Sequence, residues 1–403
     1  MRRAMTLSSQ NSGYAEKRLL VACARMNMAP GEVETLRELA SKPLDWDFII
    51  SAAAENSEMP LLSRQLSAYA ADLAPAASLE RIKGAARANT LKCLALTGEL
   101  LRILGEFQRQ GVVAIPYKGP VVAAQAYGDV ALREYEDLDV ILRQKDLKRA
   151  DEVMRGLGYA ARYPWIHSRE VAGSLVPGEY NYREEARGII VELHTELTMR
   201  HFPARIDLDA LSLRLTTVAL SGHEVKTFSP EDALPILCVH GAKDYWERII
   251  WVADVAELAQ RGSGCDWENV FRRAEELGAG RMLRVGLALA AELLGAPFPP
   301  GVAARVSRDD AAIAIANERA AQLLDREPRR MGGRAIFKYR RQMVSGGFAG
   351  WKYAWRLALE PAEEDWKETR PPRALAPMRG ALRPFRLLKK YGWGGGHERR
   401  DSN

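Results

Sequence analysis

The sequence predicts an α+β protein in which a small α/β unit with a mixed sheet lies between helical N-terminal and C-terminal regions. Helical periodicity dominates both ends of the chain, and two short apolar strands near the middle each carry acidic side chains. With 403 residues, 47% of them hydrophobic, the chain is long enough for two or three packed domains. We expect a helical N-terminal region at 1–110, an α/β unit at 111–228, a helical region at 229–300, and a helical C-terminal extension with a basic tail at 301–403.

The N-terminal region is predicted to be helical from its apolar spacing. An amphipathic segment covers residues 45–66, and a longer helix covers about 79–109. Leucines recur at helical spacing along the second segment, at Leu91, Leu94, Leu101 and Leu104. We expect both helices to contribute to the core, and the leucine stripe indicates no particular partner.

The α/β unit begins with a pattern that suits anion binding. The apolar run 112–115 predicts a short buried strand, after which Gly119 and Pro120 open a helix that continues to Tyr127. Unpaired N–H groups at a helix start attract phosphate, and Lys118 adds a positive charge beside them. A strand, a glycine and a helix also follow one another for purely structural reasons, so this motif alone leaves both interpretations open.

A pair of carboxylates follows on the next predicted strand. Asp137 and Asp139 flank Leu138 and lead into an apolar run at 140–142, so both carboxylates point to one face of the strand. Two close carboxylates repel each other unless a cation joins them, and their oxygens suit Mg²⁺. The alternative is a solvated acidic turn. The apolar run that follows directly favours a metal site.

A third acidic residue lies on a later strand. Residues 188–194 read as a β segment in which Ile190, Glu192 and His194 share one face. An isolated glutamate on a strand is usually exposed at the rim of a sheet. If this strand pairs with the aspartate strand, Glu192 instead completes a three-carboxylate metal site or takes a proton from an attacking hydroxyl.

A polar stripe marks the segment 235–260, which we expect to form one helix. His240, Lys243, Asp244, Glu247, Trp251 and Asp254 fall along one side of it. A polar stripe on a buried helix needs partners. It forms either a hydrogen-bonded network between helices or one wall of a functional cleft.

The order of these motifs resembles a known family. Lys118-Gly119, Arg133 ahead of Asp137-Leu138-Asp139, and Glu192-Leu193-His194 follow one another as in bacterial uncharacterised or putative nucleotidyltransferases of the DNA polymerase β-like superfamily. The resemblance extends to the helical lead-in. It implies a polymerase β-like α/β unit as the catalytic domain, with the 229–300 region lining its cleft.

The resemblance also implies an activity. A nucleoside monophosphate would pass from an NTP to an acceptor with release of pyrophosphate, and the acceptor would be a small molecule, a peptide or protein, or an RNA end. Asp137, Asp139 and Glu192 would hold Mg²⁺ or Mn²⁺, with Glu192 placed to activate the acceptor. The nucleotide-binding residues would be Lys118, Gly119, Arg133, His194, His240, Lys243 and Asp254.

Two positions depart from the superfamily pattern. Pro120 follows the glycine where Gly or Ser is common, and proline has neither a hydroxyl nor an N–H. Glu192 stands where many relatives have Asp. A second hypothesis is therefore a catalytically weak relative that binds nucleotide or a partner protein as a regulatory module.

Composition restricts the remaining classes of function. The four cysteines have no close spacing, so neither a zinc knuckle nor a disulfide framework is indicated. The first residues lack the apolar stretch of a signal peptide, and no window offers the roughly eighteen apolar residues of a membrane span. We therefore expect a cytoplasmic protein. A net charge of +6 permits nucleic-acid binding without arguing for it.

Two irregular segments carry weaker expectations. Between residues 159 and 188, aromatic side chains at Trp165, His167, Tyr180 and Tyr182 would stack on a base or contact the acceptor if this segment covers the site. The basic segment 370–400 either packs as a C-terminal helix followed by a loose tail, or docks on an acidic partner.

Overall fold

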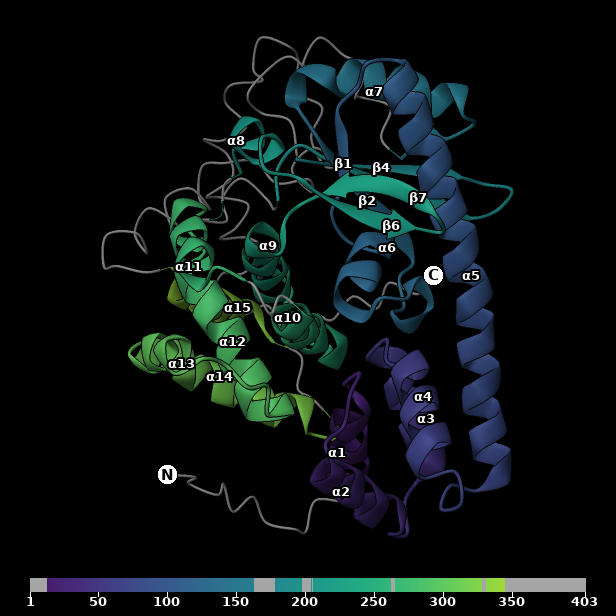
Figure 1. Ribbon diagram of the computed structural model, residues 1–403, viewed down its shortest axis with the longest axis vertical. Coiled ribbons are helices and arrows are strands. Elements are labelled where there is room, and N and C mark those ends of the chain that lie inside the picture. The colour runs from purple at the N-terminus through teal and green to yellow at the C-terminus, as the bar shows by residue number, and fades with distance from the viewer. Residues whose placement is uncertain are drawn as a thin grey trace, which may run out of the picture.

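The computed structural model of the chain describes residues 13–162, 178–197, 204, 206–261, 265–327 and 331–344. In Figure 1 the sheet lies in the upper half of the view, the first N-terminal helices lie below it, and the later helices lie below it and to the left. The predicted α+β class is confirmed. Most of the irregular segment between residues 159 and 188, the end of the C-terminal extension after residue 344 and its basic tail lie outside the described residues.

Five helices form the N-terminal region: α1 (Tyr14–Cys23), α2 (Pro30–Ala40), α3 (Trp46–Glu55), α4 (Met59–Tyr69) and α5 (Ala76–Arg109). The amphipathic segment predicted at 45–66 is two helices rather than one. Asp45 caps α3 by accepting a hydrogen bond from the Phe48 N–H at 3.0 Å. Ser57 then adopts a φ of 56°, which turns the chain before α4 begins.

Helix α5 is the longest element and runs along one side of the molecule from the N-terminal helices to the sheet (Figure 1). The buried side chains of its second half include Leu96, Leu100, Ile103 and Phe107. The helix contributes to the core, as expected, but two leucines of the predicted stripe, Leu91 and Leu94, are exposed. The spacing of the leucines correctly predicts a helix, but it does not indicate which side of a long helix packs against the rest of the protein.

The central sheet has five strands in the order β1-β2-β5-β4-β3. They are β1 (Ala114–Pro116), β2 (Asp137–Leu142), β3 (Ala160–Ala161), β4 (Glu179–Glu184) and β5 (Ile189–His194). β2 and β5 are parallel, whereas the other three pairs are antiparallel. The sheet is therefore mixed, as predicted. Tyr180 and Tyr182 are buried in β4 and do not project into an open site, which corrects the stacking role suggested for them.

Short elements connect the strands and complete the α/β unit. They are α6 (Pro120–Val122), the π-helical turn η1 (Ala123–Tyr127), the 3₁₀ turns η2 (Val130–Leu132) and η3 (Gln144–Asp146), α7 (Leu147–Gly156), α8 (Leu208–Ser212), and a hairpin of β6 (Thr216–Leu220) and β7 (His223–Thr227). The predicted helix from Pro120 to Tyr127 thus forms, with its second half widened into a π-helix.

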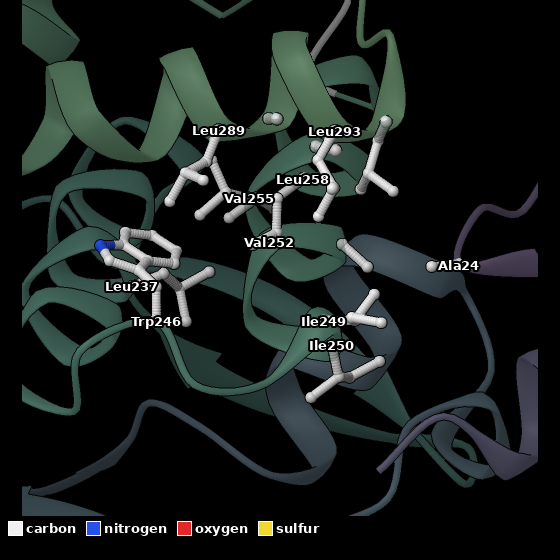
Figure 2. Close-up of a cluster of buried hydrophobic side chains, with 14 of the residues drawn as sticks. Ala24, Leu237, Trp246, Ile249, Ile250, Val252, Val255, Leu258, Leu289 and Leu293 are labelled. Atoms are coloured by element: carbon white, nitrogen blue, oxygen red, sulfur yellow. The ribbon is translucent and has the colours of Figure 1, made fainter. Parts of the chain in front are cut away.

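The helices that follow are α9 (Pro230–Lys243), α10 (Ile249–Arg261), α11 (Trp267–Glu276), α12 (Gly280–Leu294), α13 (Pro300–Ser307), α14 (Asp310–Leu323) and α15 (Gly333–Gln342). The single helix expected at 235–260 is two helices, because Tyr245 and Trp246 adopt φ values of 59° and 52°. Trp246 is buried beside Leu237, as Figure 2 shows. A Cβ atom added at Gly241 would come within 2.6 Å of its ring, so only glycine leaves room for this corner.

The two faces of the sheet pack against different cores. Leu138, Val140, Val191 and Leu193 point toward the buried residues of α5 and α7. Ile141, on the opposite face, joins a larger core built from the N-terminal helices and from α9, α10, α12 and α14. This larger core includes Val252, Val255 and Leu258 of α10 and Leu289 and Leu293 of α12 (Figure 2).

That larger core includes residues from both helical regions, so it does not mark a boundary between them. The domain boundaries predicted at 110, 228 and 300 stay predictions. All four cysteines are free thiols, as expected. Among the described residues, no helix is both long enough and apolar enough to cross a bilayer.

Candidate functional site

The register of two parallel strands brings the predicted acids together. Asp139 of β2 is the direct partner of Glu192 of β5, and Asp137 is the partner of Ile190. Residues paired in neighbouring strands point to the same face, so the carboxylates of Asp139 and Glu192 project side by side. The two strands are neighbours in one sheet, so the condition under which Glu192 joins the aspartates is met.

Three side chains converge on this face. The Nε2 atom of His194 lies 2.9 Å from Oδ1 of Asp139 and 3.5 Å from Oε2 of Glu192. One ligand atom from each of the three residues lies within 4.8 Å of the others. The converging group is therefore Asp139, Glu192 and His194, which we call the triad. The predicted metal set contained Asp137 in place of His194.

Lys118 completes the electrostatics of the triad. Its ammonium donates to Oδ1 of Asp139 at 2.6 Å; Asp139 is buried and Lys118 is mostly so. Lys118 follows β1, whose antiparallel pairing aligns Pro116 with Val140, and the N–H of Tyr117 donates to the carbonyl of Asp139 at 3.3 Å. The strand pairing thus places Lys118 next to Asp139, although the two residues are 21 positions apart in the sequence.

Gly119 has a conformation that few other residues adopt. Its φ and ψ are 51° and −123°, and a Cβ atom there would lie 3.5 Å from the carbonyl oxygen of Asp137. A Cβ atom would therefore fit at normal contact distance, but the positive φ would strain any residue that has a side chain. Gly119 therefore turns the chain from β1 into α6 while Lys118 stays aimed at the triad.

The charges of the site shift its pKa values in opposite directions. Burial disfavours ionisation of Asp139, but Lys118 and the His194 hydrogen bond outweigh it and hold the Asp139 pKa well below its usual range. Burial and the nearby carboxylates of Asp139 and Glu192 raise the pKa of Asp137 to about 6. For His194, burial opposes protonation, yet hydrogen bonds to the two triad acids raise its pKa.

The end of helix α9 lies close to these groups. Burial, together with the ammonium groups of Lys118 and Lys243, holds the pKa of His240 well below its usual range, so its imidazole is neutral. The Nζ atom of Lys243 is 3.9 Å from Oε2 of Glu179, which pairs directly with His194 in the sheet. His240 also packs edge-on against the ring of Trp251, with centroids 5.0 Å apart. The first part of the polar stripe thus lies beside the triad.

Arg133 and Asp254 bind each other away from solvent. The Arg133 guanidinium donates to both oxygens of Asp254 at 2.9 to 3.0 Å, and both side chains are buried. The hydroxyl of Tyr127 donates to the same carboxylate at 2.9 Å. At Asp254 the polar stripe therefore forms a hydrogen-bonded network between elements, which was one of the two interpretations of the stripe, rather than a wall of the cleft. It fixes the segment that leads into β2.

Two residues near the triad were not predicted. The Tyr117 ring lies edge-on to His194, 5.3 Å between centroids, and its hydroxyl is buried without a hydrogen-bond partner. The position of Tyr117 directly before Lys118 was the one feature of the sequence that could have indicated that it lies near the site. No feature of the sequence indicated Glu179. Its strand follows an irregular segment, and only strand pairing brings it to His194.

The donor set of the triad suits a divalent cation. Two carboxylates and an imidazole converge from two strands, and Asp137 adds a further carboxylate beside Asp139 on the same strand. Oxygen ligands suit Mg²⁺ and Mn²⁺, and an imidazole ligand favours the transition metals. The residues present therefore fit the metal that the resemblance implies.

Comparison with known protein families gives one match. Residues 42–295 match the family described as uncharacterised nucleotidyltransferase, which is well over half of the chain. The chain belongs to this family. The matched segment begins just before α3, ends after α12, and contains every predicted site residue from Lys118 to Asp254.

Other comparisons add little to the nucleotidyltransferase assignment. A crystal structure of an antigenic nucleotidyltransferase-like protein from Paracoccidioides brasiliensis shares 14% identity at a TM-score of 0.28, covering 54% of this chain and 92% of that one. A likeness of this size carries no argument. A comparison with curated proteins gave no match.

Proposed function

We propose that this protein transfers a nucleoside monophosphate from an NTP to an acceptor and releases pyrophosphate, with a fold of the DNA polymerase β-like type. The observation that carries the proposal is the parallel register that places Asp139 beside Glu192, with His194 and Lys118 against the same aspartate. Nucleotidyl transfer depends mainly on positioning and on neutralising phosphate charge, and this face offers both.

Asp139, Glu192 and His194 would hold a divalent cation, Mg²⁺ or Mn²⁺, with Asp137 beside them. Such an ion supplies charge neutralisation at the phosphates and orients the attacking and leaving oxygens. Glu192 is the most exposed triad member, since 19% of its side chain reaches solvent against about 4% for Asp139. That exposure suits a group that accepts a proton from the acceptor.

The residues around the triad would bind the nucleotide. Lys118 and the chain turn at Gly119 provide positive charge at the start of α6, where phosphate would lie. His240 and Lys243 would form the wall beside the triad and contact the nucleotide or acceptor. Arg133 and Asp254 would act indirectly, because their ion pair fixes the segment that leads into β2.

The acceptor would be a small molecule, a peptide or protein side chain, or an RNA end. An incubation with α-phosphate-labelled ATP, CTP, GTP and UTP, Mg²⁺ or Mn²⁺ and each acceptor class tests the reaction. Asp139→Asn and Glu192→Gln remove one negative charge each with little change of shape. The matched control is Glu136→Gln, which neutralises an exposed acid next to Asp137.

We expect label transfer to fall by at least about 10²-fold in both triad variants, because a metal clamp supplies several kcal/mol to the transition state. The control should keep wild-type transfer. Transfer that persists in both triad variants would contradict the proposed site.

A binding module with weak catalysis is the second candidate. Two observations favour it: Lys118 already pairs with Asp139, and Pro120 has no N–H to offer a phosphate. This candidate predicts that NTP binds, as measured by calorimetry, while no acceptor becomes labelled with any of the four nucleotides.

A further inference from the structure

The Lys118 ammonium occupies the place at Asp139 that a metal ion needs. Two donors meet on one oxygen atom: Lys118 Nζ lies 2.6 Å and His194 Nε2 lies 2.9 Å from Asp139 Oδ1. A carboxylate oxygen has two lone-pair directions, and these two contacts use both. A metal ion held by the triad would displace both contacts: His194 can stay as a ligand through a deprotonated Nε2, whereas the Lys118 ammonium has no lone pair for a cation and must leave.

Lys118 is the group with the freedom to leave. Its charge sits on a flexible four-carbon stem, whereas the His194 ring is held within β5 and packs edge-on against Tyr117. The Lys118 ammonium also lies 5.1 Å from the Tyr117 ring centroid and keeps 12% of its side chain exposed. A bond rotation can thus carry the ammonium from Asp139 toward the start of α6 without moving the strands.

A divalent cation and the ammonium cannot share the triad at low cost. Like charges a few ångströms apart repel strongly when both are buried. The ammonium needs another anion before it can give up Asp139. A triphosphate bound beside Lys118 would be such an anion, and it would bring the metal ion with it.

We propose that Lys118 acts as an internal counter-cation that keeps metal ions off the triad until a polyphosphate draws its ammonium away. The inference rests on the proposed function and adds its order of assembly. Free metal binds weakly, the metal–polyphosphate complex binds well, and ligands without a polyphosphate leave Lys118 on Asp139. The site thereby selects a substrate that carries both the phosphates and the metal.

Mn²⁺ binding measured by electron paramagnetic resonance tests this without any activity assay. Lys118→Gln removes the charge but leaves an N–H donor for Asp139. The matched control is Lys92→Gln, an identical charge change at an exposed lysine that pairs with Glu136. We expect Lys118→Gln to bind free Mn²⁺ about tenfold more tightly or better, because the repulsion is gone. Lys92→Gln should match the wild type.

A second measurement titrates the Mn²⁺ complex of inorganic tripolyphosphate by calorimetry. Wild-type protein should bind the complex more tightly than free Mn²⁺, and this advantage should shrink in Lys118→Gln. Lys118→Arg, which keeps the charge, should retain weak binding of free Mn²⁺. If Lys118→Gln does not fold, the wild-type comparison and Lys118→Arg still decide the question.

Unchanged or weaker Mn²⁺ binding by folded Lys118→Gln overturns the inference and leaves the proposed function standing. Equal wild-type affinities for free Mn²⁺ and for the complex do the same. Absence of Mn²⁺ binding in every variant, with and without tripolyphosphate, removes the metal site, and the proposed function falls with the inference.

Discussion

Replacing Asp137 with asparagine should stabilise the metal-free protein while weakening its site. In the folded protein, burial and the neighbouring acids Asp139 and Glu192 raise the Asp137 pKa from 3.8 to about 6. Folding therefore favours the protonated form of this carboxyl. At neutral pH, where the group is ionised in both states, its charge destabilises the folded state. Asparagine has a similar shape and carries no charge.

The size of the effect follows from the two pKa values. They differ by about 2, which corresponds to about 3 kcal/mol at about 1.36 kcal/mol per unit. The penalty is absent below the unfolded-state value of 3.8, grows as pH rises, and is complete above about 6. We therefore expect Asp137→Asn to gain about 3 kcal/mol at neutral pH, and about half of that one pH unit below the folded-state pKa.

Urea unfolding at both pH values, with a chelator present, measures the gain. Glu136→Gln is the control, and it should change stability by less than about 0.5 kcal/mol because its carboxylate is exposed. Added Mn²⁺ should reverse the order of stability, since the wild type binds the ion more tightly. Asp137→Asn that is destabilised at neutral pH, or whose gain is the same at both pH values, would refute the electrostatic reasoning.

Three further substitutions test other parts of the structure. Asp254→Ala leaves the buried charge of Arg133 without its partner and should cost about 3–5 kcal/mol in urea unfolding; a loss below about 1 kcal/mol would mean that the pair is not buried in solution. Gly119→Ala forces a side chain into a positive φ and should lower stability by about 1–3 kcal/mol and weaken metal–polyphosphate binding, so unchanged calorimetry and melting would count against the turn. Gly286→Ala places a Cβ atom 2.5 Å from Cys238 Sγ and 3.0 Å from the Trp246 ring, and we expect about 1–3 kcal/mol of destabilisation with altered tryptophan fluorescence; unchanged stability and an unaltered spectrum would show that this corner is not tightly packed.

Local patterns predicted the central unit well. The apolar run before Gly119, the aspartates on β2 and the alternation along β5 each follow from strand and helix periodicity over a few residues. The pairing of β2 with β5 was left open by the sequence, where Glu192 on an exposed rim was the alternative, and the structure decides for the pairing. Such predictions succeed where the local preference and the tertiary environment agree.

Breaks inside helices were not predictable in the same way. The segments 45–66 and 235–260 keep apolar spacing across a turn made by non-glycine residues with positive φ. At the second turn, the buried ring of Trp246 fits beside Gly241 and Gly286, which lie on two different helices. Tertiary packing there overrides the local preference for a continuous helix.

The sequence by itself determined the acid-bearing strands, the helix start after Lys118 and the family to which they point, because each depends on neighbouring residues. Only the tertiary structure decided which side chains meet. It placed His194 rather than Asp137 in the triad, paired Arg133 with Asp254, and set the Lys118 ammonium on Asp139. Strand register and helix packing join residues far apart in the chain, and no local pattern records those distances.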